Sequence, residues 1–142
     1  MYIFLDFDGV LRRLTSDRSK FDQDCTESFE SAVRLLPDIK IVITSTWRLA
    51  VSLKEMRSFF SPAIAERIVG ITPEIYSPSI SARYEEIQQY LNDNQVDQEF
   101  WVAIDDDPEG FPPNAPLVQT DPNEGFNATS KHKLWQFVAN EY

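Results

Sequence analysis

The chain has 142 residues, of which 42% are hydrophobic and 13% aromatic, a size and composition typical of one globular domain and not of a disordered segment. Its 23 acidic and 13 basic residues give a net charge of −10 at pH 7, which disfavours nonspecific binding to nucleic acid or to an anionic membrane. Cys25 is the only cysteine, which excludes an intramolecular disulfide and a cysteine-rich zinc site.

Apolar runs that resemble buried strands alternate along the chain with segments of helical periodicity. The expected strands are 2–5, 39–44 and 100–104, with a brief extended piece at 68–71 and a fainter strand at 116–119. The expected helices surround 29–36, 49–60, 63–67, 84–91 and 131–138. We expect Asp24 and Glu27 to cap the first helix, Pro37 to end it, and Ser79 or Ser81 to open the fourth.

This alternation predicts an α/β fold, a three-layer sandwich with a mainly parallel central sheet. We expect one domain over residues 1–142, with residues 12–23 as a small flap. Neither a signal peptide nor an apolar run of membrane length is visible, so we expect a cytoplasmic protein.

Acidic pairs follow two of the predicted strands. Asp6 and Asp8 come directly after the first strand, and Asp105 and Asp106 follow the strand at 100–104. Acids after strands are often ordinary turn residues or helix caps, and we interpret Asp107 as such a cap. Two pairs at the carboxyl edge of one parallel sheet, however, favour a site of hard oxygen ligands suited to Mg²⁺.

Four segments resemble the motifs of the haloacid dehalogenase (HAD) superfamily of phosphohydrolases. Segment 4–11 (FLDFDGVL) resembles the first motif, 41–45 (IVITS) the second and 102–106 (VAIDD) the fourth, while Arg83 suits the third, a lone cation. The sequence segments 45–48, 83–91 and 101–107 are similar to segments of the HAD domains of Swiss-army-knife RNA repair proteins. The resemblance covers nearly the whole chain and implies a Rossmann-like fold. The gaps at 9–39 and 48–83 are too short for a cap domain.

The resemblance also implies a phosphatase mechanism and its residues. Asp6 would be the nucleophile that forms an aspartyl-phosphate, and Asp8 would protonate the leaving oxygen and then activate water. Mg²⁺ would be held by Asp6, the backbone carbonyl of Asp8, Asp105 and Asp106, the last also orienting water or Arg83. Ser45 and backbone N–H groups near Gly9 and Thr46 would bind phosphoryl oxygens, Arg83 would neutralise charge, and Arg48 would reach a substrate phosphate.

Several alternatives stay open at this point. Thr44 competes with Ser45 for the phosphate-binding role, and Lys54, Lys131 and Lys133 compete with Arg83. Arg48 is equally suited to a structural ion pair. Packing is the favoured role for Trp47, although it directly follows the second motif and lining the site is its alternative.

The flap segment holds Arg12, Arg13, Arg18 and Lys20, a concentration of positive charge on an acidic chain. These residues either steer an anionic substrate to the metal or form an ordinary solvated loop. We expect a phosphorylated substrate, with a nucleic-acid end or a nucleotide favoured and a phosphoprotein still open. The competing function is a non-catalytic HAD-like protein that binds phosphate, metal or a partner, and the sequence leaves the oligomeric state undetermined.

Overall fold

The centre of the protein is a parallel sheet of five strands, seen in a computed structural model that describes residues 1–36, 38–76, 82–96 and 99–141. In chain order the elements are β1 (Tyr2–Leu5), α1 (Gln23–Arg34), β2 (Lys40–Ile43), the 3₁₀ turn η1 (Thr46–Leu49), α2 (Leu53–Arg57), α3 (Pro62–Ala65), β3 (Ile68–Ile71), α4 (Ala82–Asp93), β4 (Trp101–Asp105), the 3₁₀ turn η2 (Pro108–Gly110), β5 (Leu117–Gln119) and α5 (Ala128–Glu141). Across the sheet the order is β3-β2-β1-β4-β5, and every neighbouring pair is parallel. The predicted α/β sandwich is confirmed, and no cap domain is evident in the described ranges.

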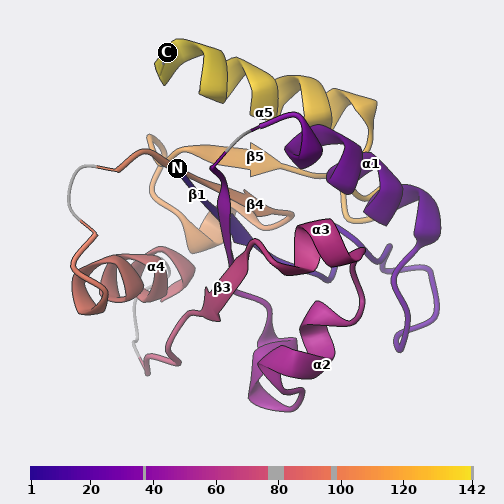
Figure 1. Ribbon diagram of the computed structural model, residues 1–142, viewed down its shortest axis with the longest axis horizontal. Coiled ribbons are helices and arrows are strands. Elements are labelled where there is room, and N and C mark those ends of the chain that lie inside the picture. Colours follow the sequence, from indigo (N-terminus) through magenta and orange to yellow (C-terminus); the bar gives the residue numbers. More distant parts are fainter. Residues whose placement is uncertain (37, 77–81, 97–98, 142) are drawn as a thin grey trace.

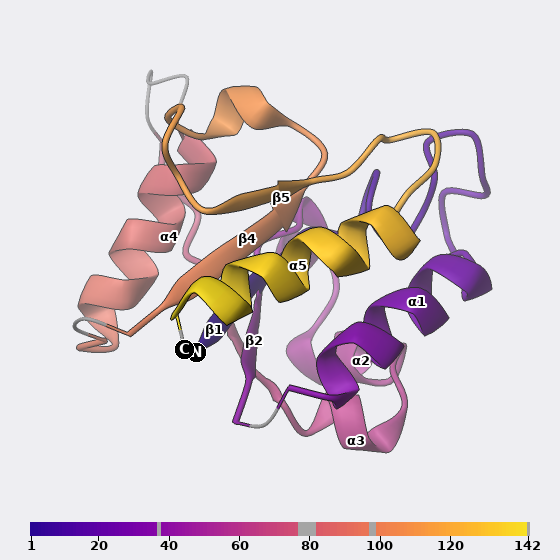
Figure 2. The same cartoon turned by 90° about the horizontal axis from the view of Figure 1, so that it is seen from above.

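Helices cover both faces of the sheet, with α1 and α5 side by side on one face and α4 on the other (Figure 1; Figure 2 gives the view from above). Successive residues of a strand point to opposite faces. Ile3 and Leu5 of β1 therefore join a core with α1, α2, α3 and α5, while Tyr2 and Phe4 join a second core beneath α4. All four residues of β1 are buried because both faces of the strand are covered.

The strand predictions are confirmed, including the brief extended piece, which is β3 and pairs with β2 at one edge of the sheet. The helix predicted over 49–60 is present but shorter: α2 covers Leu53–Arg57, and Leu49 belongs to the separate turn η1. Ser52 accepts a hydrogen bond from the N–H of Glu55 (3.1 Å) and so starts α2 afresh.

The predicted capping pair of α1 is wrong. The residue before the helix is Asp22, whose carboxylate accepts a bond from the N–H of Arg13 (2.7 Å) and ties the flap segment to the helix start. Pro37, Ser79 and Ser81, predicted as helix boundaries, lie outside the described residues. Within the described ranges, each helix is too short or too polar to cross a bilayer.

Candidate active site

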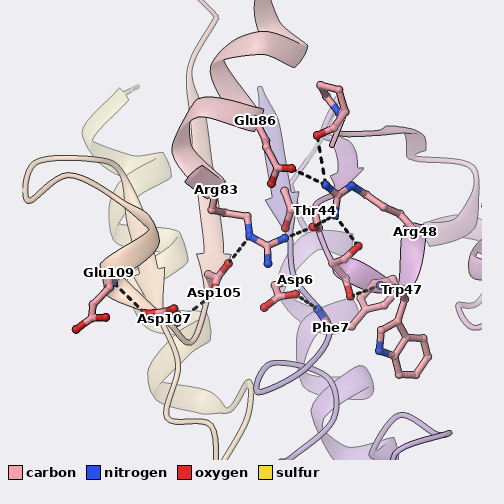
Figure 3. Close-up of polar contacts among 12 residues, drawn as sticks. Asp6, Phe7, Thr44, Trp47, Arg48, Arg83, Glu86, Asp105, Asp107 and Glu109 are labelled. Atoms are coloured by element: carbon pink, nitrogen blue, oxygen red, sulfur yellow. Dashed lines mark hydrogen bonds and ion pairs between the residues drawn. The ribbon is translucent and has the colours of Figure 1, made fainter. Parts of the chain in front are cut away.

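The central position of β1 brings three polar loops together at the carboxyl edge of the sheet. Leu5 pairs with Ile43 of β2 and with Ile104 of β4, so the residues that follow these strands emerge side by side. The N–H of Asp6 donates to the carbonyl of Ile104 (3.1 Å), and the N–H of Thr44 donates to the carbonyl of Leu5 (2.9 Å). The sheet hydrogen bonds thus continue to the first residues after β1 and β2 and fix their positions. Figure 3 shows Asp6, Thr44 and Asp105 at this edge.

Three aspartates from two of these loops form one acidic group, called here the three-Asp cluster: Asp6, Asp105 and Asp106. One carboxylate oxygen from each lies within 4.8 Å of the others. Asp6 and Asp105 are buried, and Asp106 is partly exposed. Carboxylate oxygens this close repel one another, so the arrangement could bind a divalent cation.

The protonation behaviour of the three-Asp cluster fits a cation site. Burial raises the pKa of Asp6 from 3.8 to about 6, an effect that nearby Arg83 opposes and Asp106 reinforces. Burial, with the charge of Asp6, raises the pKa of Asp105 from 3.8 to about 8. The pKa of Asp106 is raised as well, again mainly by burial. A bound divalent cation would reverse these effects by stabilising the ionised carboxylates, so the residues present fit such a metal.

Gly9 leaves the space that Asp106 occupies. Its φ of +78° lies in the left-handed region, and a Cβ built there would be 2.3 Å from Oδ2 of Asp106. The carbonyl of Gly9 also accepts a bond from the hydroxyl of buried Thr120 (2.7 Å), which ties this turn to the end of β5. A glycine here therefore allows the close contact between the first and fourth motif loops.

Asp8 is not part of the three-Asp cluster, and its carboxylate contacts the flap and Trp47. Its Oδ1 accepts a bond from Nε of Arg12 (2.7 Å), and its Oδ2 accepts a bond from the indole Nε1 of Trp47 (3.2 Å). Arg12 is buried. Both oxygens of Asp8 thus have defined partners, and any part that Asp8 takes in a metal site would come from its backbone carbonyl.

Arg83 is the cation placed next to the three-Asp cluster. It projects from the first turn of α4, its Nε lies 3.6 Å from Oδ2 of Asp105, and its Nη1 donates to the carbonyl of Thr44 (Figure 3). The rival Lys131 lies in α5, where its ammonium contacts Ser31 (3.2 Å) and the ring of Trp135. Lys54 is exposed on α2 and Lys133 on α5.

The loop after β2 presents hydroxyl and backbone groups to the same edge. Buried Ser45 precedes η1, and its Oγ accepts a bond from the N–H of Trp47 (3.2 Å). Thr46 is exposed at the start of the turn. Thr44 is also buried, and its carbonyl accepts bonds from two arginines, Arg48 and Arg83.

The side chain of Arg48 is used within the protein. Its guanidinium is buried, pairs with Glu86 of α4 at 2.8 Å and donates to the carbonyls of Thr44 and Thr72, each at 2.8 Å. These contacts match the structural ion pair, the alternative to the substrate-binding role. A guanidinium with its donors engaged has little left for a phosphate.

The flap cations divide into two groups. Arg12 pairs with Asp8, and Arg13 makes two hydrogen bonds to Asp24, one of 3.0 Å, so both arginines are paired with acidic side chains of the protein itself. Arg18 and Lys20 are exposed, and they make no ion pair within the part of the chain that the structure describes. The predicted steering charge therefore reduces to two residues.

Two contacts at Asp8 were missed from the sequence. The sequence predicts Arg12 as one of the flap cations, and because residues 8–12 form a turn and not a helix, the i,i+4 spacing of helical ion pairs gives no signal for its contact with Asp8. Packing is the predicted role of Trp47, and no local sequence signal indicates that its indole N–H reaches Asp8, 39 residues away. Asp107 has the predicted role, since its carboxylate accepts a bond from the N–H of Glu109 (2.9 Å) and caps η2.

Comparison with protein families finds a match over most of the chain. Residues 2–130 match the family described as the HAD domain in Swiss Army Knife RNA repair proteins. The match includes every strand of the sheet and every residue of the site described above. Comparison with curated proteins and with solved structures finds no significant match.

Proposed function

Because this chain belongs to the family of HAD domains found in Swiss Army Knife RNA repair proteins, we propose that it is a Mg²⁺-dependent phosphomonoester hydrolase that acts through an aspartyl-phosphate. The observation that carries the proposal is the three-Asp cluster, with Asp6 buried between the neighbouring loops and Arg83 beside it. HAD domains generally use a divalent metal, and a set of carboxylate oxygens without His or Cys favours Mg²⁺ over zinc.

In the proposed first step, a carboxylate oxygen of Asp6 attacks the phosphorus of the substrate, and the bond from phosphorus to the ester oxygen breaks. Asp8 gives its proton to the leaving oxygen. In the second step Asp8 takes a proton from water, the water oxygen attacks the same phosphorus, and the bond to Asp6 breaks. Inorganic phosphate leaves, and both carboxyl groups return to their starting state.

Asp8 would have two states in this cycle, and both of its hydrogen-bond partners favour the ionised one. The guanidinium of Arg12 stabilises the carboxylate that exists after the first proton transfer. The indole N–H of Trp47 fixes the orientation of the second oxygen without adding charge. Together they would hold Asp8 in one orientation while its proton comes and goes.

The remaining charges at the edge would be balanced as follows. Mg²⁺ would be held by Asp6, Asp105, Asp106 and the backbone carbonyl of Asp8, and it would supply positive charge to the phosphoryl oxygens. Arg83 would neutralise charge on Asp105 and on the phosphoryl group. Ser45 and the backbone N–H groups near Gly9 and Thr46 would bind the phosphoryl oxygens that the metal does not reach.

We further propose that the phosphate is carried by a nucleic-acid end or a nucleotide. The support is an edge without an evident cap domain among the described residues, which leaves Asp6 reachable by a large molecule, and the two exposed cations, Arg18 and Lys20. The net charge of −10 argues against tight sequence-independent binding. These cations would therefore raise kcat/KM more than they would stabilise a lasting complex.

Replacement of Asp6 by Asn tests the proposal. The amide is a poor nucleophile, so we expect turnover of a phosphorylated oligonucleotide to fall by at least about 1,000-fold. Beryllium fluoride or trapped substrate phosphate should mark Asp6 alone in the unmodified chain. Asp107→Asn is the matched control, because Asp107 caps η2 outside the three-Asp cluster, and its turnover should stay close to that of the unmodified protein. A phosphoryl group found on another residue would refute the assignment of the nucleophile.

A further inference from the structure

A hollow lined by aromatic side chains lies beside Asp8 and has no part in the proposed chemistry. Its volume is about 320 Å³, and Ser19, Lys20, Phe21, Trp47 and Phe59 line it. The three aromatic side chains are each partly exposed, whereas Ser19 and Lys20 are exposed. We call this feature the aromatic hollow.

The walls of the aromatic hollow are held in place from behind. Phe21 lies 5.5 Å from Trp47 and 5.3 Å from Phe59, measured between ring centroids. Buried Phe7 packs edge-on against Trp47 at 5.5 Å, and buried Phe60 packs against Phe21 at 5.7 Å. Rings fixed by such contacts lose little freedom when a ligand binds, which favours binding.

The aromatic hollow is connected to the reaction centre through one side chain. Trp47 lines the hollow, and its Nε1 donates to Oδ2 of Asp8 at 3.2 Å. Under the proposed mechanism Asp8 faces the leaving oxygen. Because Trp47 contacts Asp8, the hollow would lie on the side of the leaving group under that mechanism.

We propose that the aromatic hollow is a subsite that stacks a nucleobase of the leaving nucleic-acid end. The proposal rests on the proposed phosphatase function and adds the subsite and its residues. Stacked aromatic rings combined with cations that contact the backbone are the usual means of holding single-stranded nucleic acid. Lys20 lines the hollow, Arg18 lies two residues before it in the sequence, and both are exposed. A second phosphate of the bound nucleic acid would therefore have a cationic partner there.

The composition of the hollow distinguishes this occupant from others. A sugar phosphate has no flat ring to stack on Trp47 or Phe21. A phosphotyrosine peptide has such a ring but carries no regular second phosphate for Lys20 and Arg18. A nucleic-acid end supplies both groups, at the spacing of one base per phosphate.

The kinetic test compares two oligonucleotides that differ only at the phosphorylated end, one with its base and one abasic. We expect the unmodified protein to favour the base by about 5- to 150-fold in kcat/KM, the factor that corresponds to stacking of about 1–3 kcal/mol. Phe59→Leu should remove most of this preference, so that the ratio of kcat/KM between the two substrates falls toward one, and Phe21→Leu should do the same. Tyr76→Leu, which removes a fully exposed ring outside the hollow, should retain the preference.

A binding test separates this proposal from the phosphatase assignment. A dinucleoside monophosphate without a terminal phosphate should quench the fluorescence of the unmodified protein and of Asp6→Asn, but not of Trp47→Phe. If the unmodified protein shows quenching but does not hydrolyse phosphorylated oligonucleotides, the proposed function is overturned and the subsite is supported. Turnover with equal kcat/KM for the two ends, absence of quenching, or a phosphotyrosine peptide as the better substrate would overturn the subsite.

Discussion

Gly9→Ala is the change with the most direct expected effect on the three-Asp cluster. The new Cβ would lie 2.3 Å from Oδ2, 2.4 Å from Cγ and 2.8 Å from Cβ of Asp106. These distances are all below van der Waals contact, so Asp106 must move, and because its own Cβ is involved the backbone of one of the two loops must shift together with the side chain. The carboxylate would then leave the position in which its oxygen lies within 4.8 Å of those of Asp6 and Asp105.

Two separate magnitudes follow from this geometry. A φ of +78° costs an alanine about 1–2 kcal/mol relative to glycine, and the steric overlap with Asp106 adds to this cost, so the free energy of unfolding should fall by at least that amount. Displacement of Asp106 removes one ligand of the proposed metal site. We expect Mg²⁺ affinity to fall by at least about 10- to 100-fold, the range seen when groups that orient metal ligands are lost.

Gly125→Ala is the matched control for the backbone effect. Gly125 has a similar φ of +70°, and its Cβ would lie 2.6 Å from Sγ of Cys25 and 2.9 Å from the carbonyl oxygen of Val10, away from the three-Asp cluster. Chemical denaturation should show a loss of stability for both variants. Calorimetric titration should show weaker Mg²⁺ binding for Gly9→Ala alone. Wild-type Mg²⁺ affinity in a folded Gly9→Ala protein would refute the placement of Asp106 at the metal.

Two further predictions follow from the charges of the site. The pKa values of Asp6 and Asp105 are raised in the metal-free protein, so these carboxyls bind protons more tightly when folded, and stability should fall as pH rises from about 4 toward 8. Mg²⁺ binds the ionised carboxylates, so the gain in Tm from saturating Mg²⁺ should grow over the same pH range, and a gain that shrinks as pH rises would contradict the assignment of these carboxylates as ligands. After EDTA treatment, Mn²⁺ but not Zn²⁺ should restore activity in place of Mg²⁺. Replacing Arg18 and Lys20 together by Ser should lower kcat/KM for an oligonucleotide end by about 3- to 10-fold at low salt and flatten its salt dependence. As a control with the same change in charge, replacing the two lysines of α5 (131 and 133) by Ser should have little effect. Equal losses in the two variants would show that net charge and not the flap matters.

The fold could be predicted from the sequence because its strands are continuous apolar runs. A strand covered on both faces must be apolar at every position, and β1, with four buried residues, satisfies this. Helix boundaries were less certain, because they depend on single capping contacts. The bond from the N–H of Glu55 to Ser52 divides the apolar pattern of 49–60 into two elements, although the spacing of the apolar residues continues across it.

The three-Asp cluster could also be predicted, for a topological reason. Acids that directly follow neighbouring parallel strands must meet at one edge, whatever the details of packing. The direction of the Asp8 side chain could not be predicted, because it depends on Trp47, which lies on another loop. Nor does the sequence distinguish Arg12, which is buried beside Asp8, from Arg18, which is exposed.

The buried ion pair of Arg48 connects the fold to the chemistry of the edge. Arg48 bonds to the carbonyls of Thr44 and Thr72, after β2 and β3, and pairs with Glu86 on α4 (Figure 3). Glu86 lies three residues after Arg83, on the same side of the helix. A buried pair adds little stability compared with apolar residues of the same size, but it strongly disfavours arrangements that separate its partners. The ion pair therefore restricts how far the first turn of α4 can move from the sheet, and it keeps Arg83 within reach of the three-Asp cluster.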